Sequence, residues 1–332
     1  RSKGNAIRSR DSFGNNSVGI FEINPNISIK TRFLKAAILD ITLLESDASA
    51  RGTEILEYFR HCYNDLSQED RDKKFKKNRE ILEDILRLVQ CSRAGRKGNL
   101  PQYYMQSSTG RWYCHGPFVS LQNMPKQLRP LVFQGHYDYD IESCHYALFA
   151  QMVFKHNFKT PIIDRLLADK AAFRLNIAKA ADLPVPEVKQ ALISLIYGSP
   201  LNPSVFCSLG NTLGRGPADN FCKLKIIKLL HAEIKIGARL IIEGYKKRSR
   251  RKGSIINDIG RSCTISKSSQ ASQLAHILQG AEAQILSCIG ERWGAVMVLL
   301  MHDGFITKKQ IHTDSKKEPK SIKNVLKNFL LN

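Results

Sequence analysis

Long apolar runs are missing from this sequence. The longest extends from Ala295 to Met301 and has seven residues, whereas a bilayer-spanning helix needs about 18. The first residues, Arg-Ser-Lys-Gly-Asn, are polar and lack the apolar core of a secretory signal. We therefore expect neither a membrane segment nor a membrane partner.

Closely spaced cysteine pairs are also missing. The chain has eight cysteines, and none of them forms a C-x-x-C motif, which excludes a zinc ribbon or a thioredoxin-like motif. Isolated cysteines in a chain of this length are typical of reduced, mostly buried thiols. We expect an intracellular, reducing compartment, and a viral, plasmid or organellar origin is compatible with it.

Acidic residues are scarce relative to basic ones. The chain of 332 residues has 51 Lys and Arg against 30 Asp and Glu, which gives a formal net charge of +21. A surplus of this size needs a polyanionic partner, and nucleic acid is the first candidate. It argues against a metabolic enzyme that acts only on small molecules.

The positive charge is concentrated in runs. The first run covers 71–79, and lysines 308, 309, 316 and 317 lie near the C-terminus. The second run, here called the basic cluster, consists of Lys246, Lys247, Arg248, Arg250, Arg251 and Lys252. We predict that these residues line a duplex channel through phosphate contacts. The alternatives are a solvated charged face or, for the basic cluster, a localisation signal.

Hydrophobic periodicity predicts an α+β fold with helices between the strands of a small sheet. We expect strands at 133–141, 295–301 and 305–308, and a loop at 199–217. The expected helices cover most of 31–90, 142–155, several segments within 160–199 with one beginning near Pro186, 218–245 and 268–289.

Two aspartates stand out by their setting. Asp303 lies in a turn between two apolar strands, and Asp140 lies at the end of the strand predicted at 133–141. Carboxylates held rigidly at strand ends can bind two divalent metal ions, which stabilise an in-line phosphoryl displacement. The alternative is that Asp303 and Gly304 are only a hairpin turn signal.

A lysine and a tyrosine share one stripe of a predicted helix. Lys189, Ile193 and Tyr197 are spaced four residues apart, and Gly198 follows. This face is suited to holding a triphosphate and stacking beneath a base. The alternative is a surface lysine beside a core tyrosine.

Further segments complete an ordered set of motifs, namely Ser108-Thr-Gly-Arg111, Ser120-Leu-Gln-Asn-Met-Pro125 and Gln279-Gly-Ala-Glu-Ala283. The set resembles the family A nucleic-acid polymerases, which are bacterial DNA polymerase I and its relatives, with single-subunit phage-type RNA polymerases as cousins. The first two segments are similar to the T-x-x-G-R and L-Q-N-I-P elements, and the third to Q-G-x-A-A. Residues 140–150, Lys189 to Gly198, and His302-Asp303 resemble motifs A, B and C. The resemblance covers about residues 105 to 310.

The resemblance implies a right-hand polymerase with a palm sheet, helical fingers and a short helical thumb. It divides the chain into an irregular lead-in at 1–30, a helical thumb-like region at 31–100, the first part of the palm at 101–158, fingers at 159–265, and the second part of the palm with a basic tail at 266–332.

Residue roles also follow from the resemblance. Asp140, Asp303 and the carbonyl of Ile141 would hold two Mg²⁺ ions, with Mn²⁺ as an alternative. The nucleotide-binding residues would be Lys189, Ile193, Tyr197, Gly198 and His145, with Lys189 also counted as catalytic. The primer–template residues would be Arg111, Gln122, Asn123, Gln279 and His302.

The chain departs from the family pattern at several positions. Val185 occupies the place of an arginine that contacts the triphosphate, and Arg174 or Lys179 are the candidate substitutes. His145 replaces a glutamate that helps to exclude the ribose 2′-hydroxyl, which leaves sugar choice open. Gly304 follows Asp303 in place of the usual glutamate or serine.

Asp138 is a competing motif A aspartate. Asp140 is preferred because Ala150 keeps the register of the motif only with Asp140.

We therefore expect template-directed nucleotidyl transfer, with a DNA-dependent DNA polymerase that extends a primer 3′-hydroxyl and has no proofreading exonuclease of its own. Its partners would be a DNA primer–template and nucleoside triphosphates, with RNA as the alternative template. The alternative functions are an RNA polymerase or primase on the same scaffold, or a non-catalytic nucleic-acid-binding subunit with a polymerase-like core.

Overall fold

The computed structural model describes residues 20–23, 66–91, 102–115, 120–124, 133, 136–249 and 251–311. Most of the expected lead-in, apart from Ile20–Ile23, and most of the thumb-like region lie outside these ranges. Within that region the expectation of helix is confirmed for α3 (Gln68–Cys91).

No described helix is long and apolar enough to cross a membrane. None of the six cysteines from 114 to 288 is in a disulfide bond.

The chain divides into two compact units. The first unit contains Arg1–Gln106, Trp112–Asp140 and Ile289–Val325. The second unit contains Ser107–Arg111, Ile141–Cys288 and Leu326–Asn332. Each unit is described separately below.

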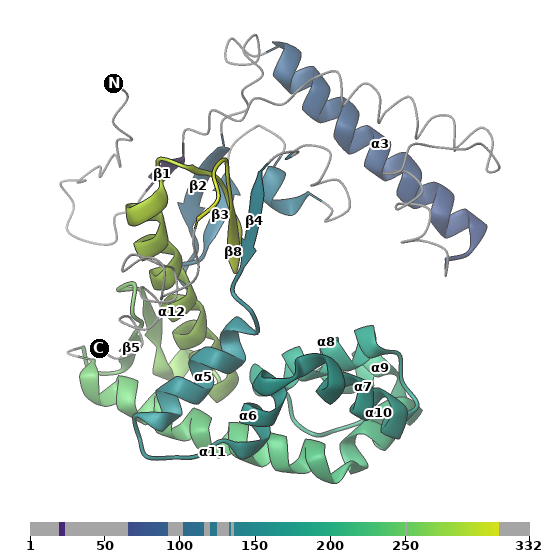
Figure 1. Ribbon diagram of the computed structural model, residues 1–332. Coiled ribbons are helices and arrows are strands. Elements are labelled where there is room, and N and C mark those ends of the chain that lie inside the picture. The colour runs from purple at the N-terminus through teal and green to yellow at the C-terminus, as the bar shows by residue number, and fades with distance from the viewer. Residues whose placement is uncertain are drawn as a thin grey trace. The chain divides into compact units, whose positions relative to one another are not determined.

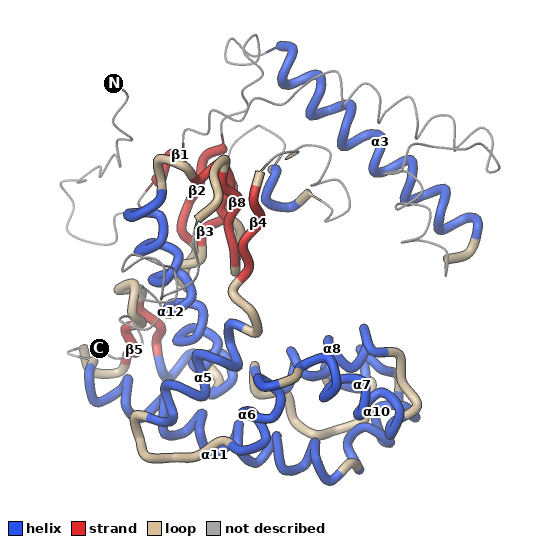
Figure 2. The backbone as a smooth tube through the Cα atoms, in the orientation of Figure 1, coloured by secondary structure: helices blue, strands red, loops and turns tan. Residues whose placement is uncertain are grey.

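The first unit contains two antiparallel sheets, each with three strands (Figures 1 and 2). One has the order β1-β2-β3, formed by Ile20–Ile23, Gln102–Gln106 and Trp112–His115. The other has the order β4-β8-β7, formed by Tyr137–Asp140, Gly304–Thr307 and Met297–Leu300. A short 3-10 helix, η2, covers Leu121–Asn123. The predicted strand at 133–141 is therefore confirmed only for Tyr137–Asp140.

Strands β7 and β8 form part of the buried core of this unit. Every residue of both strands is buried, as their uninterrupted apolar sequence predicts. The Tyr139 ring of β4 stacks on Phe305 of β8 with a centroid distance of 5.2 Å. The Tyr139 hydroxyl donates to the carbonyl of Ile311 and accepts from its N–H. Tyr139 therefore fixes β4 against β8.

The second unit is mostly helical. Its helices are α5 (Cys144–Phe154), α6 (Pro161–Ala168), α7 (Lys170–Ala181), α8 (Val185–Ile196), α9 (Ser208–Leu213), α10 (Arg215–Lys223), α11 (Lys225–Arg248) and the larger part of α12 (Gln270–Trp293). A hairpin of β5 (Ser254–Ile256) and β6 (Ser262–Thr264) lies between α11 and α12 in the sequence (Figure 1).

Two expectations about this unit are wrong. The segment 199–217 is not only a loop, because α9 and the start of α10 lie within it. The segment 218–245 is not one helix, because Leu224 adopts an extended conformation and separates α10 from α11. No proline or glycine marks this break, and apolar residues on both sides continue the helical pattern. Only the packing of the two helices reveals it.

Candidate active site

Asp140 and Asp303 lie at the same end of the β4-β8-β7 sheet. In the β4–β8 ladder Asp140 is paired with Gly304, the residue that follows Asp303. The turn between β7 and β8 is closed by a 2.8 Å hydrogen bond from the N–H of Met301 to the carbonyl of Gly304. Both aspartates are exposed. The sheet register therefore places two aspartates, more than 160 residues apart in the sequence, at neighbouring positions of the backbone.

Gly304 makes this approach feasible. A Cβ at this position would overlap the carbonyl oxygen of Tyr139 and lie 3.3 Å from the Cα of Asp140. Backbone atoms of a paired strand cannot move aside as the end of a flexible side chain can. Gly304, the residue after Asp303, thus has a steric reason in this chain.

We expect Gly304→Ala to destabilise the first unit. The added methyl group meets backbone atoms of β4, and overpacking of this kind costs about 1–3 kcal/mol. Urea unfolding should show a lower midpoint for the variant. Gly216→Ala is the control, because nothing lies within 4 Å of its added Cβ. Equal stability of the two variants would contradict the close approach.

The alternative aspartate, Asp138, lies on the same strand and is also exposed. It is paired with Ile306, two residues further from the turn than Gly304. Residues two apart on a strand point to the same face, so orientation does not separate the two candidates. The strand register separates the two candidates. Asp140 is paired with Gly304, next to the turn that carries Asp303, and Asp138 is not.

The two carboxylates fit Mg²⁺ better than a metal that needs a protein cage. Within the described ranges, no group of three or more His, Cys, Asp and Glu residues could hold a metal ion. Mg²⁺ is commonly held by one or two carboxylates together with waters and substrate phosphates. The carbonyl of Ile141 accepts a 3.2 Å hydrogen bond from the N–H of Cys144, and a carbonyl oxygen has a second lone pair.

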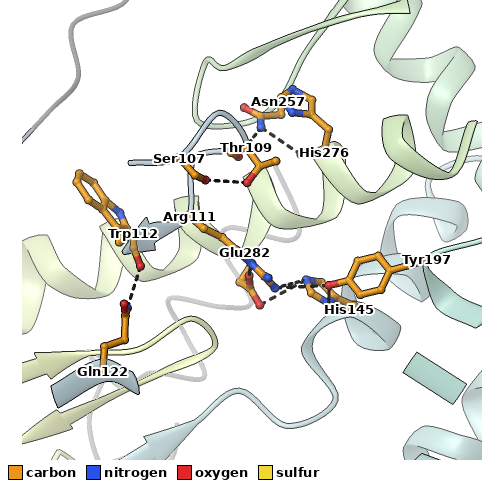
Figure 3. Close-up of polar contacts among 10 residues, drawn as sticks. All are labelled: Ser107, Thr109, Arg111, Trp112, Gln122, His145, Tyr197, Asn257, His276 and Glu282. Carbon is orange, nitrogen blue, oxygen red and sulfur yellow. Dashed lines mark hydrogen bonds and ion pairs between the residues drawn. The ribbon is translucent and has the colours of Figure 1, made fainter. Parts of the chain in front are cut away.

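A polar network in the second unit joins residues from four sequence motifs (Figure 3). The Nε of Arg111 lies 2.5 Å from Oε2 of Glu282, and Nε2 of His145 lies 3.4 Å from Oε1 of the same carboxylate. The Tyr197 hydroxyl lies 2.8 Å from Nδ1 of His145 and 3.5 Å from Nη2 of Arg111. The Gln279 side chain also hydrogen-bonds Tyr197. We refer to these residues as the Glu282 network.

Glu282 is the member of this network that the motif analysis did not single out. Its side chain is completely buried. Burial by itself would raise the pKa of Glu282, but hydrogen bonding and charge from His145 and the charge of Arg111 lower it below the usual value. The sequence contained a signal, because Glu282 is an acid within a run of small and apolar residues three positions after Gln279.

The loop that carries Arg111 is held in place by the β5–β6 hairpin. The Asn257 side chain donates to the carbonyls of Thr109 (2.8 Å) and His276 (3.1 Å), which links residues 107–111 to α12. The loop is closed by a 2.8 Å hydrogen bond between the N–H of Ser107 and the carbonyl of Arg111. Backbone contacts of the loop therefore help to position Arg111.

Helix α8 presents its motif residues away from its core face. Lys189 and Ile193 are exposed, whereas Val188, Leu192 and Leu195 are buried. Tyr197 directly follows the last residue of α8. Burial raises the pKa of its hydroxyl, and the positive charge of Arg111 opposes this shift.

Gly198 follows Tyr197 with a φ of +83°. This left-handed conformation suits glycine and ends the helix. A Cβ at Gly198 would lie 3.0 Å from the Cβ of Ala271. The helix end that carries Tyr197 therefore lies directly against the start of α12.

The remaining motif residues of the first unit differ in accessibility. Gln122 is buried, and its amide donates to the carbonyls of Trp112 and Leu300 and accepts from the N–H of Cys114. Asn123 is exposed. The His302 ring lies 4.6 Å from the half-exposed Tyr113 ring. The Gln122 side chain therefore ties strands together, and a contact with a primer–template would require these bonds to break.

The basic cluster is partly engaged in ion pairs. Lys246 pairs with Glu243 at 2.8 Å, and Arg248 lies 3.6 Å from Asp258. Lys247, Arg251 and Lys252 are exposed, and Arg250 lies outside the described residues.

The fold is similar to that of a DNA polymerase domain. No protein-family model and no curated protein matches the sequence. Among solved structures, the POL domain of Pol1 from M. smegmatis, in complex with DNA primer–template and dNTP, matches with a TM-score of 0.56 at 12% sequence identity. The match covers 92% of this chain and 64% of that chain. At this identity the similarity concerns the fold.

Proposed function

We propose that this chain catalyses template-directed nucleotidyl transfer, as a DNA polymerase that extends a primer 3′-hydroxyl. The pairing of Asp140 with Gly304 is the observation that carries the proposal, because it puts two exposed aspartates on neighbouring backbone positions at one sheet end. Similarity to a polymerase domain that was solved with primer–template and dNTP supports it. The net charge of +21 is consistent with a nucleic-acid partner.

The two carboxylates define the metal-binding part of the proposal. Asp140 and Asp303, with the carbonyl of Ile141, would hold two Mg²⁺ ions, with Mn²⁺ as the alternative. When bound, these ions supply charge neutralisation at the triphosphate and a more acidic primer hydroxyl. Gly304 serves this arrangement by letting the two strands approach closely.

The side chains of the second unit would bind and orient the nucleotide. Lys189 is the sole cation of α8 and would bind the triphosphate and stabilise its developing charge. Val185, at the start of the same helix, contributes no charge. Ile193 and Gly198 would border the nucleotide, and the Tyr197 ring would lie beside the nascent base pair. Because Arg111, His145 and Gln279 all contact the Tyr197 hydroxyl, they would fix the orientation of this ring.

Primer–template binding is assigned to Asn123, His302, Gln279 and Arg111 near the growing end, with Gln122 supporting the strands behind Asn123. The exposed residues of the basic cluster would contact duplex phosphates. In this proposal residues 101–158 and 266–332 form the palm, 159–265 form the fingers, and the helix α3 belongs to a thumb-like region.

An RNA polymerase or primase is the second candidate, and His145 is the observation that favours it. Both ring nitrogens of His145 are engaged, Nε2 with Glu282 and Nδ1 with Tyr197. A histidine held in this way replaces the glutamate that family A DNA polymerases use against the ribose 2′-hydroxyl.

One incorporation assay tests both candidates. We expect Mg²⁺-dependent extension of a primed DNA template with dNTPs, measured in four combinations of dNTPs or rNTPs with or without primer. Preference for rNTPs, or synthesis without a primer, would replace the leading candidate with the second. Salt-sensitive DNA binding without incorporation in any combination, with Mg²⁺ or Mn²⁺, would leave only a nucleic-acid-binding subunit.

A further inference from the structure

The second unit contains a cavity of about 580 Å³ that the proposed reaction does not use. It is formed between α5, α11, α12 and the turn that joins β5 to β6. The lining residues are Gln151, Met152, Lys155, His156, Ile241, Gly244, Tyr245, Arg248, Asp258 and Gln284. None of them belongs to the Glu282 network, and only Arg248, as a member of the basic cluster, has a part in the proposed function. The volume lies within the ordinary range of small-molecule sites.

The lining combines an apolar interior with a basic rim. Ile241 and Tyr245 are buried and Met152 is half-buried, whereas Lys155, His156 and Arg248 are exposed. Such a cavity suits a ligand that has a flat or apolar body and a negatively charged group at one end.

A stacked pair forms one wall. The guanidinium of Arg248 lies over the Tyr245 ring, 3.9 Å from its centroid, and the Arg248 side chain is 61% exposed. One face of the guanidinium covers the tyrosine, so the other face is available to a ligand. Guanidinium planes of this kind stack on nucleic-acid bases.

The single acid of the lining, Asp258, contacts both members of the stacked pair. The Tyr245 hydroxyl donates to Oδ2 of Asp258 at 2.5 Å, and Nη2 of Arg248 lies 3.6 Å from Oδ1. Asp258 therefore orients the stacked pair, and its charge is offset where an anion would approach. Asp258 is the only acid of the lining, and its ion pair is with Arg248 rather than with Lys155.

Hydrogen-bonding capacity in the cavity is unused. Among the described residues, no side-chain partner contacts Gln151, Lys155 or His156, and the Gln284 amide reaches only the sulfur of Cys288 at 3.5 Å. An amide offers both a donor and an acceptor, which is what the edge of a base requires. Lys155 and His156 offer donors to a phosphate.

We propose that this cavity binds a nucleotide, with the base stacked on Arg248, its edge facing Gln151 and Gln284, and its phosphate at Lys155 and His156. The nucleotide is either free or part of a single strand. A strand is compatible with the surface, because Arg248 belongs both to the cavity and to the basic cluster, and the exposed Lys247, Arg251 and Lys252 lie close to it in sequence. Nucleotide binding at this cavity does not require the chain to be catalytic.

Methyl NMR of the full chain tests this proposal. The chain has five methionines, and Met152 is the one that lines the cavity. With ¹³C-methyl methionine labelling, and Met152→Leu to assign the signal, we expect AMP to shift the Met152 signal in a saturable manner. Met301, next to His302, reports separately on binding near the carboxylates. Adenosine alone and inorganic phosphate alone should shift Met152 only at much higher concentrations.

Substitutions of exposed side chains test the phosphate contacts, and they should leave folding unchanged. We expect Lys155→Ala and His156→Ala each to weaken AMP binding at the Met152 signal about tenfold, because each removes a charge-assisted hydrogen bond. Lys228→Ala is the control, an exposed lysine on α11 that does not line the cavity. An unmoved Met152 signal, an equal shift with phosphate alone, or AMP binding that survives both variants would overturn the proposal.

Two oligonucleotides identify the source of the nucleotide. A twelve-residue oligothymidylate that shifts Met152 at lower concentration than thymidine monophosphate, while an abasic strand of equal length does not, supports a site for an unpaired base of a strand. Equal potency of the mononucleotide and the oligothymidylate supports a site for free nucleotides. Equal shifts by the abasic strand would overturn base recognition.

Discussion

Replacement of Asp140 or Asp303 by Asn is expected to reduce primer extension by at least about 10³-fold. Each substitution keeps the side-chain size and removes one negative charge from the sheet end where β4 meets the β7–β8 turn. Since both carboxylates are exposed, folding should be preserved, and equal thermal unfolding midpoints would verify this. The measurement is single-turnover incorporation of one nucleotide on a primed template in Mg²⁺.

Asp138→Asn is the matched control for this prediction. Asp138 lies on the same strand, is exposed like Asp140, and differs in being paired with Ile306 in the ladder. We expect it to retain activity within a few-fold of the wild type. Loss of activity in Asp138→Asn with full activity in Asp140→Asn would move the metal site to the alternative aspartate. Full activity in Asp303→Asn would refute the carboxylate pair itself.

The second prediction concerns the contribution of the Glu282 network to the stability of the chain. Glu282→Ala is expected to lower the free energy of unfolding by about 3 kcal/mol or more, because it leaves Arg111 and His145 without their shared carboxylate. Urea unfolding followed by circular dichroism measures the loss. Glu291→Ala is the control, an exposed glutamate on the same helix α12, and should change stability little. Similar losses in both variants would show that the Glu282 network contributes no specific stability.

The pH dependence of this loss follows from the lowered pKa of Glu282. The ordinary glutamate pKa is about 4.3, and the folded chain holds it lower. The ionised carboxylate therefore stabilises the fold fully above the ordinary pKa, and its contribution disappears as the pH falls through the lowered folded pKa. The stability difference between the wild type and Glu282→Gln should be largest near neutral pH and shrink below pH about 4. A difference that grows on acidification would contradict the ion-pair interpretation.

Local spacing was enough to predict most of the secondary structure around the candidate site. The apolar run before His302 and the turn at Asp303-Gly304 predict β7 and β8, because an apolar run that meets a turn signal has few alternatives. The four-residue spacing of Lys189, Ile193 and Tyr197 predicts one helical stripe. Lys189 and Ile193 do lie on α8 and are exposed, whereas Tyr197 follows the last residue of the helix. Motif order also selected Arg111, His145, Tyr197 and Gln279, which the fold places in one network.

Contacts between residues far apart in the sequence determined the features that local spacing did not predict. The role of Glu282 arises from contacts with Arg111 and His145, which are more than 130 residues away in the sequence. The steric need for Gly304 depends on the backbone of Tyr139, and the cavity beside Arg248 exists only once three helices and a hairpin turn have packed together. The amino-acid sequence specifies residue type and spacing, which limit local conformation through sterics and periodicity. The partner of a buried charge, the close approach of two strands and the space left between helices depend on which distant surfaces pack together, and the folded chain alone reveals these.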